Sequence, residues 1–456
     1  MSGLHGFTAA LACAATLACA ADGFAEIAVS RQTSPGGLAF RHVPMPEETH
    51  QALAFAWQDG SAVALPGKEA LVALGPVLIM EGPNGLTRSA VHEALLDLQA
   101  GINLTATTSL LRGSLSAPAE KFAEAAKILM RTLADPALPE NRLAELRKAR
   151  AEASWQAAEN PETLAERLLM RLVLGDDPYY RILTAQPAIF ARIERADIEA
   201  WRRNIVIRDG LLIVAAGPLD AAQAGAEIDR IFGGLPASGS RPAPPPPTPH
   251  GSGKLVVLEK PVVQTAIALA GPTTVAFTPD FMRANLAVTA LSGGFYSRLY
   301  RAVRERLGAA YNISASLQNV DMNVRNLLIH TAVANDKAQD ALAAIRAEYA
   351  RLLADGVTAE EIDPVRARFA TQMSERMRRA QELAPQLVTL ALHDFPDDFL
   401  ATYEARVRGQ PLAAINADVR AKFPPPPLTT VVVAPSAEGY GADCVIKAAD
   451  EIARCD

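Results

Sequence analysis

Apolar and polar positions follow the same order of patterns twice along this chain. In each half, a strand-like apolar stretch precedes two amphipathic helical patterns, and the second helix opens with acidic residues that suit the helix dipole. These segments are residues 113–118, 119–135 and 139–156 in the first half, and residues 327–336, 338–355 and 359–373 in the second half. The repetition predicts an internal duplication.

Each half then ends in a continuous apolar run, at residues 210–218 and 428–435. Their β-branched content is typical of buried strands. Helices that are segregated from antiparallel strands, rather than strictly alternating with strands, favour the α+β class. We therefore predict two similar lobes, each an antiparallel sheet with packed helices, which face one another across a cleft.

The clearest boundary in the sequence is a proline-rich stretch at residues 238–253. Proline at this density removes backbone donors and favours polyproline II, so we interpret the stretch as a semi-rigid, solvated linker. It divides the chain into an N-terminal lobe over residues 26–237 and a C-terminal lobe over residues 254–456. The length of 456 residues, of which half are apolar, is sufficient for two such cores.

The first 25 residues differ from the rest, because Phe7 to Ala21 is a short apolar run of small residues. We interpret residues 1–25 as a signal peptide for export, with a periplasmic destination. Cys19 leaves open a lipid-anchored alternative. No other segment is long enough to cross a bilayer, so no transmembrane segment is expected. A net charge of −6 with dispersed basic residues argues against nucleic acid as a partner.

Two cysteines, Cys444 and Cys455, remain after the signal. An even number in an oxidising compartment suggests one disulfide. The intervening sequence is helical in pattern, however, and 11 residues of helix would separate the two Cα atoms by about 16 Å. A disulfide requires less than about 7 Å. The pairing therefore requires this segment to turn back on itself.

The most informative stretch is SGGFYSRLYRAVRERLGAAYNISASLQ at residues 292–318. Its pattern predicts a helix whose apolar face is formed by Phe295, Leu299, Val303 and Leu307, a left-handed glycine cap at Gly308, and then a strand. Arg304 and Tyr311 project near the corner between the helix and the strand. From spacing alone, Arg304 is an ordinary solvated arginine and Tyr311 a half-buried strand residue.

The order and spacing of these residues resemble the C-terminal domain of the insulinase/pitrilysin family of zinc metallopeptidases. The segments KLVVLEKPVVQTAIALAGP at residues 254–272, PYYRIL at 178–183 and IFGGLP at 231–236 extend the resemblance over nearly the whole chain after the signal. It implies that Arg304 and Tyr311 contact a peptide substrate. An arginine and a phenol can donate hydrogen bonds to substrate carbonyls or to a developing oxyanion.

The family's zinc motif, His-x-x-Glu-His, is absent from the sequence. By position it falls on residues that cannot bind zinc, and Pro76 should interrupt the helix that carries the motif, at a cost of about 3 kcal/mol. No two histidines are three or four residues apart. We interpret His92 with Glu93, and also Glu152 at the place of the distant third ligand, as exposed helix residues. The residues at the motif positions are Ala73, Leu74, Gly75, Pro76 and Val77.

The resemblance thus implies a metal-free subunit of a heterodimeric exported peptidase. A homologous partner chain would supply the zinc site, and this chain would supply Arg304 and Tyr311. A second hypothesis is a scaffold or peptide-binding protein that retains the fold without activity. A third, an independent peptidase with another metal site, is disfavoured by the histidine spacing.

Overall fold

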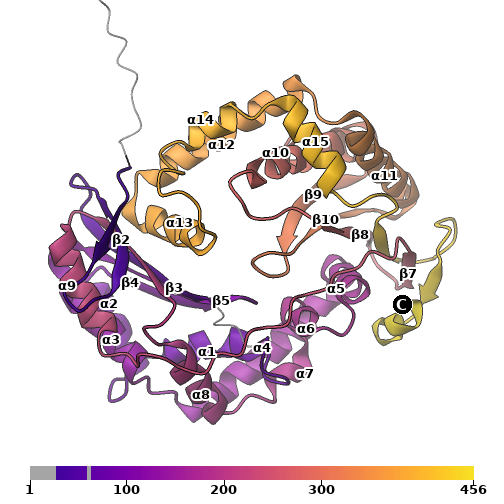
Figure 1. Ribbon diagram of the computed structural model, residues 1–456. Helices are drawn as coiled ribbons and strands as arrows, with labels where there is room; N and C mark the ends of the chain where they lie inside the picture. Colours follow the sequence, from indigo (N-terminus) through magenta and orange to yellow (C-terminus); the bar gives the residue numbers. More distant parts are fainter. Residues whose placement is uncertain (1–26, 59–62) are drawn as a thin grey trace, which may run out of the picture.

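The computed structural model describes residues 27–58 and 63–456. The expected signal peptide at residues 1–25, with Cys19, lies outside the described residues. Two six-stranded sheets form the centres of two lobes (Figure 1), in the orders β1-β2-β6-β3-β5-β4 and β12-β7-β11-β8-β10-β9. The strands are Ser30–Thr33 (β1), Ala39–Pro44 (β2), His50–Gln58 (β3), Gly101–Ala106 (β4), Leu110–Pro118 (β5), Leu211–Gly217 (β6), Leu255–Glu259 (β7), Gln264–Thr273 (β8), Ala310–Asn319 (β9), Arg325–Ala334 (β10), Thr429–Ala434 (β11) and Cys444–Ile446 (β12).

Helices cover the outer face of each sheet and also pass between the lobes. The α-helices of the first half are Leu71–Ile79 (α1), Arg88–Asp97 (α2), Phe122–Ala134 (α3), Glu140–Glu159 (α4), Pro161–Leu174 (α5), Pro178–Leu183 (α6), Pro187–Phe190 (α7), Arg195–Ile205 (α8) and Ala221–Phe232 (α9). Those of the second half are Phe281–Ser292 (α10), Ala338–Asp355 (α11), Ala359–Met377 (α12), Ala380–Leu392 (α13), Tyr403–Arg408 (α14) and Leu412–Lys422 (α15). A π-helix spans Tyr300–Arg306 (η2), and short 3₁₀ turns occupy Ala119–Lys121 (η1), Asn335–Lys337 (η3) and Ala449–Cys455 (η4).

The predicted α+β class and the two similar lobes are confirmed, but the sheets are mixed rather than antiparallel. β6 pairs in parallel with β2, and β11 and β12 pair in parallel with β7. β6 and β11 each insert between two strands that run in opposite directions, so each is antiparallel to one neighbour (β3 or β8) and parallel to the other (β2 or β7). The third parallel pair is made by β12, which adds to the edge of the second sheet beside β7.

Each lobe supplies a helix to the sheet of the other lobe. α5, from the first half, packs on β8 and β11, whereas α13, from the second half, packs on β3 and β6 (Figure 1). The strand faces that receive these helices carry three alternating alanines, which let a helix approach closely while the interior stays filled. These alanines are Ala52, Ala54 and Ala56 on β3, and Ala266, Ala268 and Ala270 on β8.

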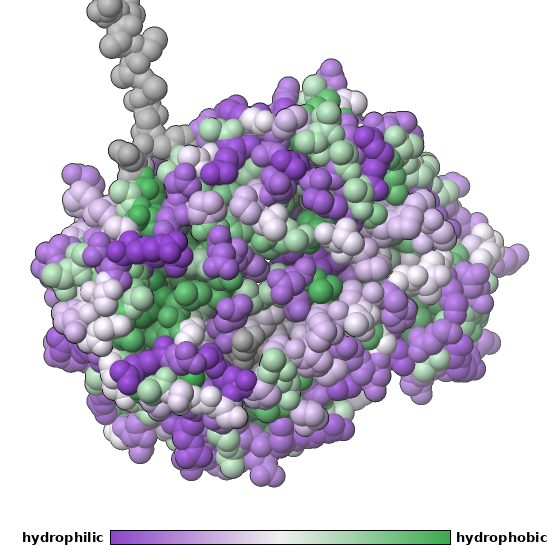
Figure 2. Space-filling view, viewed as in Figure 1, coloured by the Kyte–Doolittle hydropathy of each residue, from purple (hydrophilic) through white to green (hydrophobic). Residues whose placement is uncertain are grey.

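The opposite faces of the same strands carry large apolar side chains. Phe55 and Trp57 of β3 pack against Phe232 of α9, with ring centroids 5.1 and 6.4 Å apart, respectively. Both faces of each central strand are thereby buried. On the surface in Figure 2, apolar residues gather over the strands of the first sheet beside α13, while the rest of this view is mainly polar.

The proline-rich stretch at residues 238–253 contains no helix or strand, and most of it is exposed. It is nevertheless fastened to the first half by several hydrogen bonds, two of which are to α5 and α6. The Tyr179 hydroxyl donates to the Pro245 carbonyl at 2.9 Å, and the His250 amide donates to the Val173 carbonyl at 2.9 Å. The stretch therefore packs along α5 and α6 and is not a free linker.

One contact between α5 and the second sheet depends on a proton. His330 Nδ1 of β10 lies 2.8 Å from Glu166 Oε1 of α5. The hydrogen bond to Glu166 raises the pKa of His330 above its ordinary value of 6.5, against the opposing effect of burial, and Glu162 adds to the rise. A raised folded-state pKa stabilises the fold fully below the unfolded pKa, and this stabilisation is lost as pH rises through the folded pKa.

We therefore predict that His330→Gln lowers the melting temperature more at about pH 5.5 than at about pH 8.5. Thermal unfolding of both proteins at the two pH values measures the difference. His92→Gln, an exposed histidine of α2, is the matched control and should show no such pH dependence. If His330→Gln lowers the melting temperature equally at both pH values, the contact with Glu166 does not depend on protonation of His330.

Candidate functional site around Arg304 and Tyr311

The site begins with a turn that separates two helices. α10 ends at Ser292, and Gly294 follows with φ of +125°, a conformation that suits glycine. The Ser297 hydroxyl donates to the Gly294 carbonyl at 2.7 Å and closes the turn. Phe295 therefore lies in a turn and is 66% exposed, so its predicted place on the buried helix face is wrong. The glycine pair ends the helical repeat before Phe295 is reached.

The helix that follows is a π-helix rather than the predicted α-helix. Leu299 and Val303 are buried, as the apolar pattern predicted, and Ala302 is buried beside them. Gly308, with φ of +56°, terminates η2 in the expected left-handed conformation, and its amide donates to the Arg304 carbonyl at 3.1 Å. π-helical turns are rare and are often found at functional sites.

Arg304 and Tyr311 lie against each other at the corner between η2 and β9. The Arg304 Cζ is 4.8 Å from the Tyr311 ring centroid and 4.9 Å from the Tyr300 ring centroid, so the guanidinium lies over two aromatic rings. Tyr311 is 82% exposed, not half-buried. Within residues 27–58 and 63–456, no hydrogen bond or ion pair engages the Arg304 side chain. Its N–H donors are available to a ligand.

Tyr300 is a site residue that the sequence reasoning missed. It precedes Arg304 by four positions, a spacing that places two side chains on the same side of a helical turn. That spacing was the available signal. The Phe295 ring in turn packs edge-on against Tyr300, with centroids 5.1 Å apart, and Tyr296 beside it is 79% exposed. The site is thus an exposed aromatic surface with one arginine in it.

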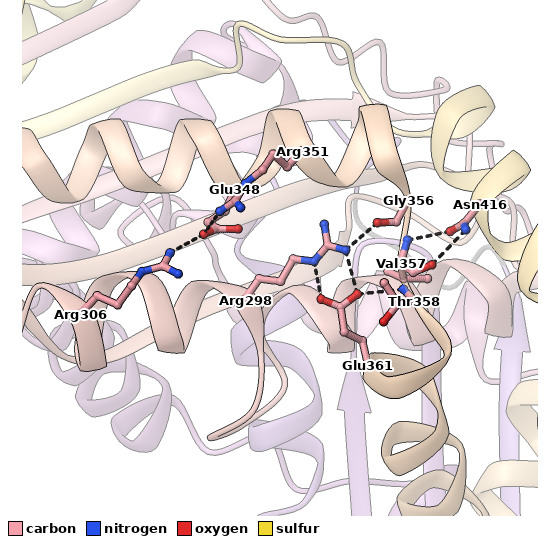
Figure 3. A network of polar contacts seen from close by, with 9 residues as sticks. All are labelled: Arg298, Arg306, Glu348, Arg351, Gly356, Val357, Thr358, Glu361 and Asn416. Atoms are coloured by element: carbon pink, nitrogen blue, oxygen red, sulfur yellow. Dashed lines mark hydrogen bonds and ion pairs between the residues drawn. The ribbon is translucent and has the colours of Figure 1, made fainter.

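The start of this helical segment is anchored by the arginine of the Ser-Arg-Leu motif. Arg298 donates from Nε and Nη2 to the two oxygens of Glu361 at 2.6 and 2.7 Å, and from Nη2 to the Gly356 carbonyl at 2.6 Å (Figure 3). The Glu361 carboxylate also accepts from the Thr358 amide at 2.9 Å, as the capping residue of α12. A single carboxylate therefore joins the segment that carries Arg304 to the junction between α11 and α12.

The charges in this network support one another. Hydrogen bonding to Glu361 raises the pKa of Arg298. Burial opposes the charge of Glu361, but the hydrogen bonds from Arg298 and Thr358 hold the pKa of this carboxyl below its usual range. Both pKa shifts therefore favour the ionised form of the pair.

Two further contacts complete the anchor in Figure 3. Glu348 of α11 accepts from Arg306 of η2 at 2.6 Å and also from Arg351. Asn416 accepts from the Val357 amide at 2.8 Å and donates to the Val357 carbonyl at 3.0 Å, which fixes the turn between α11 and α12. Both ends of η2 are thus tied to α11 and α12.

The segment at the expected zinc-motif positions is helical, contrary to the prediction that Pro76 would break it. α1 runs through Pro76, and the Met80 amide donates to the Pro76 carbonyl at 3.0 Å. The helix buries Leu71, Leu74 and Leu78 almost completely. Burial stabilises the fold by about 1.5–3 kcal/mol for each of these leucines. Their combined contribution exceeds the cost of about 3 kcal/mol for a proline within a helix.

The side chains of α1 do not fit a zinc ion. Ala73 and Val77, at the positions of the two histidine ligands, are partly buried and pack on the core of the first lobe. A side-chain carbon at Gly75 would lie 2.5 Å from the Trp201 ring, so Trp201 occupies the space beside this turn. Neither alanine nor valine can ligate a metal.

The other candidate ligands are dispersed. His92 and Glu93 are exposed on α2, and Glu152 is exposed on α4, where it lies 3.8 Å from Lys148. In the part of the chain that the structure describes, no group of three or more His, Cys, Asp or Glu side chains is placed to hold a metal ion.

Cys444 and Cys455 form a disulfide, with their Cα atoms 5.7 Å apart. The continuous helix that the pattern suggested for residues 444–455 does not form. β12 uses Cys444 to Ile446 to pair with β7, and the chain then reverses into η4. Pairing with the sheet edge outweighs the weak helical pattern of so short a segment.

Among the described residues, none of the helices has the length and apolar character needed to span a bilayer.

The fold and this corner define a two-lobed α+β protein whose N-terminal lobe, in the residues that the structure describes, holds no cluster of metal ligands. Residues 192–369 match the family model described as Peptidase M16 inactive domain. The resemblance to the insulinase/pitrilysin family is therefore confirmed over this segment, and the His-x-x-Glu-His motif of that family is absent from the sequence.

Similar proteins agree with this assignment. An uncharacterised zinc protease of Mycobacterium tuberculosis is 24% identical over 206 residues, which are 44% of this chain and 47% of that relative, so the match spans about half its length. A peptidase M16 inactive domain of Pseudomonas fluorescens has the same fold, with a TM-score of 0.80 at 19% identity, over 90% of this chain and 98% of that one.

The periplasmic protease PqqL of Escherichia coli also has this fold, with a TM-score of 0.75 at 17% identity. The likeness covers 90% of this chain but only 47% of PqqL. The present chain therefore corresponds in fold to about half of that larger protein.

Proposed function

We propose that this chain is the non-catalytic subunit of an exported, heterodimeric zinc metallopeptidase. A homologous partner chain supplies the zinc and the His-x-x-Glu-His motif, and this chain contributes Arg304 and Tyr311 to the substrate. The observation that carries the proposal is an Arg304 that lies against Tyr311 and has no acceptor among the described residues, together with a first lobe that lacks the His-x-x-Glu-His motif. The likeness to about half of PqqL supports a second half in a separate chain.

In this proposal, the chain binds the substrate peptide and polarises its carbonyl group. Arg304 and the Tyr311 hydroxyl donate hydrogen bonds to a peptide that enters from the partner's side. Such donors stabilise negative charge that develops on a substrate oxygen without attacking it. The zinc of the partner supplies the activated water, so neither residue is needed as a base. Anchoring of η2 at both ends keeps the two donors in place while substrate exchanges.

Export to the periplasm belongs to the same proposal. The apolar run at the N-terminus of the sequence supports it, and the Cys444–Cys455 disulfide is compatible with an oxidising compartment. The domain organisation proposed with it keeps lobes at residues 26–237 and 254–456 joined by the stretch at 238–253.

The proposal is tested by mild affinity purification of the tagged chain from its native host, with mass identification of co-purifying chains. We expect a chain of similar size that carries His-x-x-Glu-His. In the recovered complex, Arg304→Ala should lower kcat/KM for peptide hydrolysis by about 100-fold without loss of assembly, as for removal of one oxyanion donor. Arg301→Ala, an exposed arginine one turn earlier, is the matched control and should retain activity.

Recovery of the chain alone, or with unrelated proteins, would favour the scaffold hypothesis. Unchanged turnover by the Arg304→Ala complex would remove the assigned role of Arg304 even if the partner is found.

A further inference from the structure

Like its neighbour Arg301, Arg304 has no carboxylate partner among the described residues, but of the two only Arg304 lies over aromatic rings. Arg298 is paired with Glu361, and Arg306 and Arg351 share Glu348. Within the described ranges, Arg304 instead contacts only the rings of Tyr300 and Tyr311, at 4.9 and 4.8 Å. Glu361 and Glu348 are therefore committed to other arginines, and the adjacent, exposed Glu305 forms no ion pair with Arg304.

The two rings restrict Arg304 without using its hydrogen-bond donors. Contact of a guanidinium with an aromatic ring contributes about 0.5–1 kcal/mol at an exposed site. Two such contacts hold the group in one position, so that less side-chain entropy is lost when a ligand binds. Phe295 packs against Tyr300 and supports this ring from behind. The planar fork of N–H groups remains free.

The geometry of a free guanidinium fork selects for one ligand chemistry. A carboxylate presents two oxygens that accept two parallel N–H bonds, whereas a peptide carbonyl presents one. A bond to an ionised acceptor is also about twice as strong as a bond to a neutral one. Since Glu348 and Glu361 are paired with other arginines, and Glu305 forms no ion pair with Arg304, the ligand has to bring its own negative charge.

We propose that Tyr300, Arg304 and Tyr311 form a carboxylate-binding clamp, and that the peptide bound here presents a carboxylate to Arg304. This inference rests on the proposed function in taking a peptide as the ligand, and it narrows the substrate class to peptides with an acidic side chain or a free C-terminus at this position. Tyr300 is a positioning residue that acts through Arg304.

Three eight-residue peptides with an N-terminal uncharged boron-dipyrromethene dye, which has no carboxylate, distinguish the two sources of the carboxylate. One has a central Glu and an amidated C-terminus, one has Gln and a free C-terminus, and one has Gln and an amidated C-terminus. Fluorescence anisotropy with the purified full chain at low salt gives each affinity. We expect at least one carboxylate peptide to bind about tenfold more tightly than the neutral peptide, which is the effect of one charged hydrogen-bond pair.

The variants separate the ring from the charge. Arg304→Gln should abolish the preference, and Arg304→Lys should weaken it because a lysine cannot bind in the two-pronged way. Tyr300→Phe should keep the preference because it keeps the ring, whereas Tyr300→Ala should reduce it. Arg301→Gln is the control for charge alone. Thermal melting confirms that each variant is folded.

Equal affinity for all three peptides would overturn the inference. So would a preference that persists in Arg304→Gln, or an absence of binding up to about 1 mM, the weakest affinity that is useful here. The failure is separable from that of the proposed function. If the chain prefers carboxylate peptides but no zinc-bearing partner is recovered, the carboxylate-binding clamp stands and the subunit role is rejected. If a zinc-bearing complex is recovered whose activity depends on Arg304 but which does not prefer carboxylate peptides, the subunit role stands and the clamp is rejected.

Discussion

Replacing Glu361 with alanine is expected to lower the free energy of unfolding by about 3 kcal/mol, since it leaves the Arg298 guanidinium largely buried without its counter-ion. The side chain of Arg298 is 13% exposed, and it would retain only the Gly356 carbonyl as an acceptor. The Thr358 amide would lose its capping acceptor as well. Urea unfolding followed by circular dichroism measures the change.

Glu375→Ala is the matched control, because this glutamate lies on the same helix but is exposed. It should be nearly neutral. The Glu361→Ala variant should also lose the orientation of η2, so its binding of peptide at Arg304 should weaken even at temperatures where it is folded. Stability loss no greater than that of the control would mean that Arg298 finds another acceptor and that Glu361 does not anchor the site.

Restoring the zinc motif with Ala73→His, Pro76→Glu and Val77→His should give a chain that binds about one zinc ion. α1 retains its helical path, so two histidines four positions apart would lie on the same face. α4 packs against α1 and carries Glu152, which we expect to turn toward the new histidines as the third ligand in this variant. Metal analysis of the purified variant by plasma mass spectrometry, after dialysis against zinc, gives the stoichiometry.

The same triple variant with Glu152→Ala should bind zinc at least tenfold more weakly, since it provides two ligands in place of three. A variant with glutamines at positions 73 and 77 controls for nonspecific binding. A folded triple variant that retains no zinc would show that α1 and α4 no longer have the separation that a metal site needs.

Local patterns predicted most of the helices and strands because the signals are periodic and strong. The helix expected at residues 338–355 corresponds to α11 at Ala338–Asp355, and the apolar run at 428–435 contains β11. The wrong expectations share a cause, which is that long-range packing decides the outcome. Pro76 stays within a helix because its neighbours are buried, and residues 444–455 turn because Cys444 pairs with β7.

The corner formed by Arg304 and Tyr311 was open to sequence reasoning because it is local, with a glycine cap between a helix and a strand. The π-helical winding of η2 was not, since i→i+5 bonding has no apolar period that differs clearly over seven residues. The carboxylates that anchor the segment could not be predicted from the sequence either. Glu361 is 63 positions from Arg298, and no pattern in a single sequence indicates such a pair.

The exchange of α5 and α13 gives the proline-rich stretch a different meaning from that of an ordinary interdomain connection. Each alanine face is covered by the other half of the chain, so neither half could be made alone without exposing an apolar sheet to water. A cut within residues 238–253 would leave both faces covered, because the two fragments remain hooked together through their helices. The chain could thus be divided at this stretch into two co-expressed fragments with little change to the folded molecule. Deleting either half, in contrast, would leave the remaining half unable to fold.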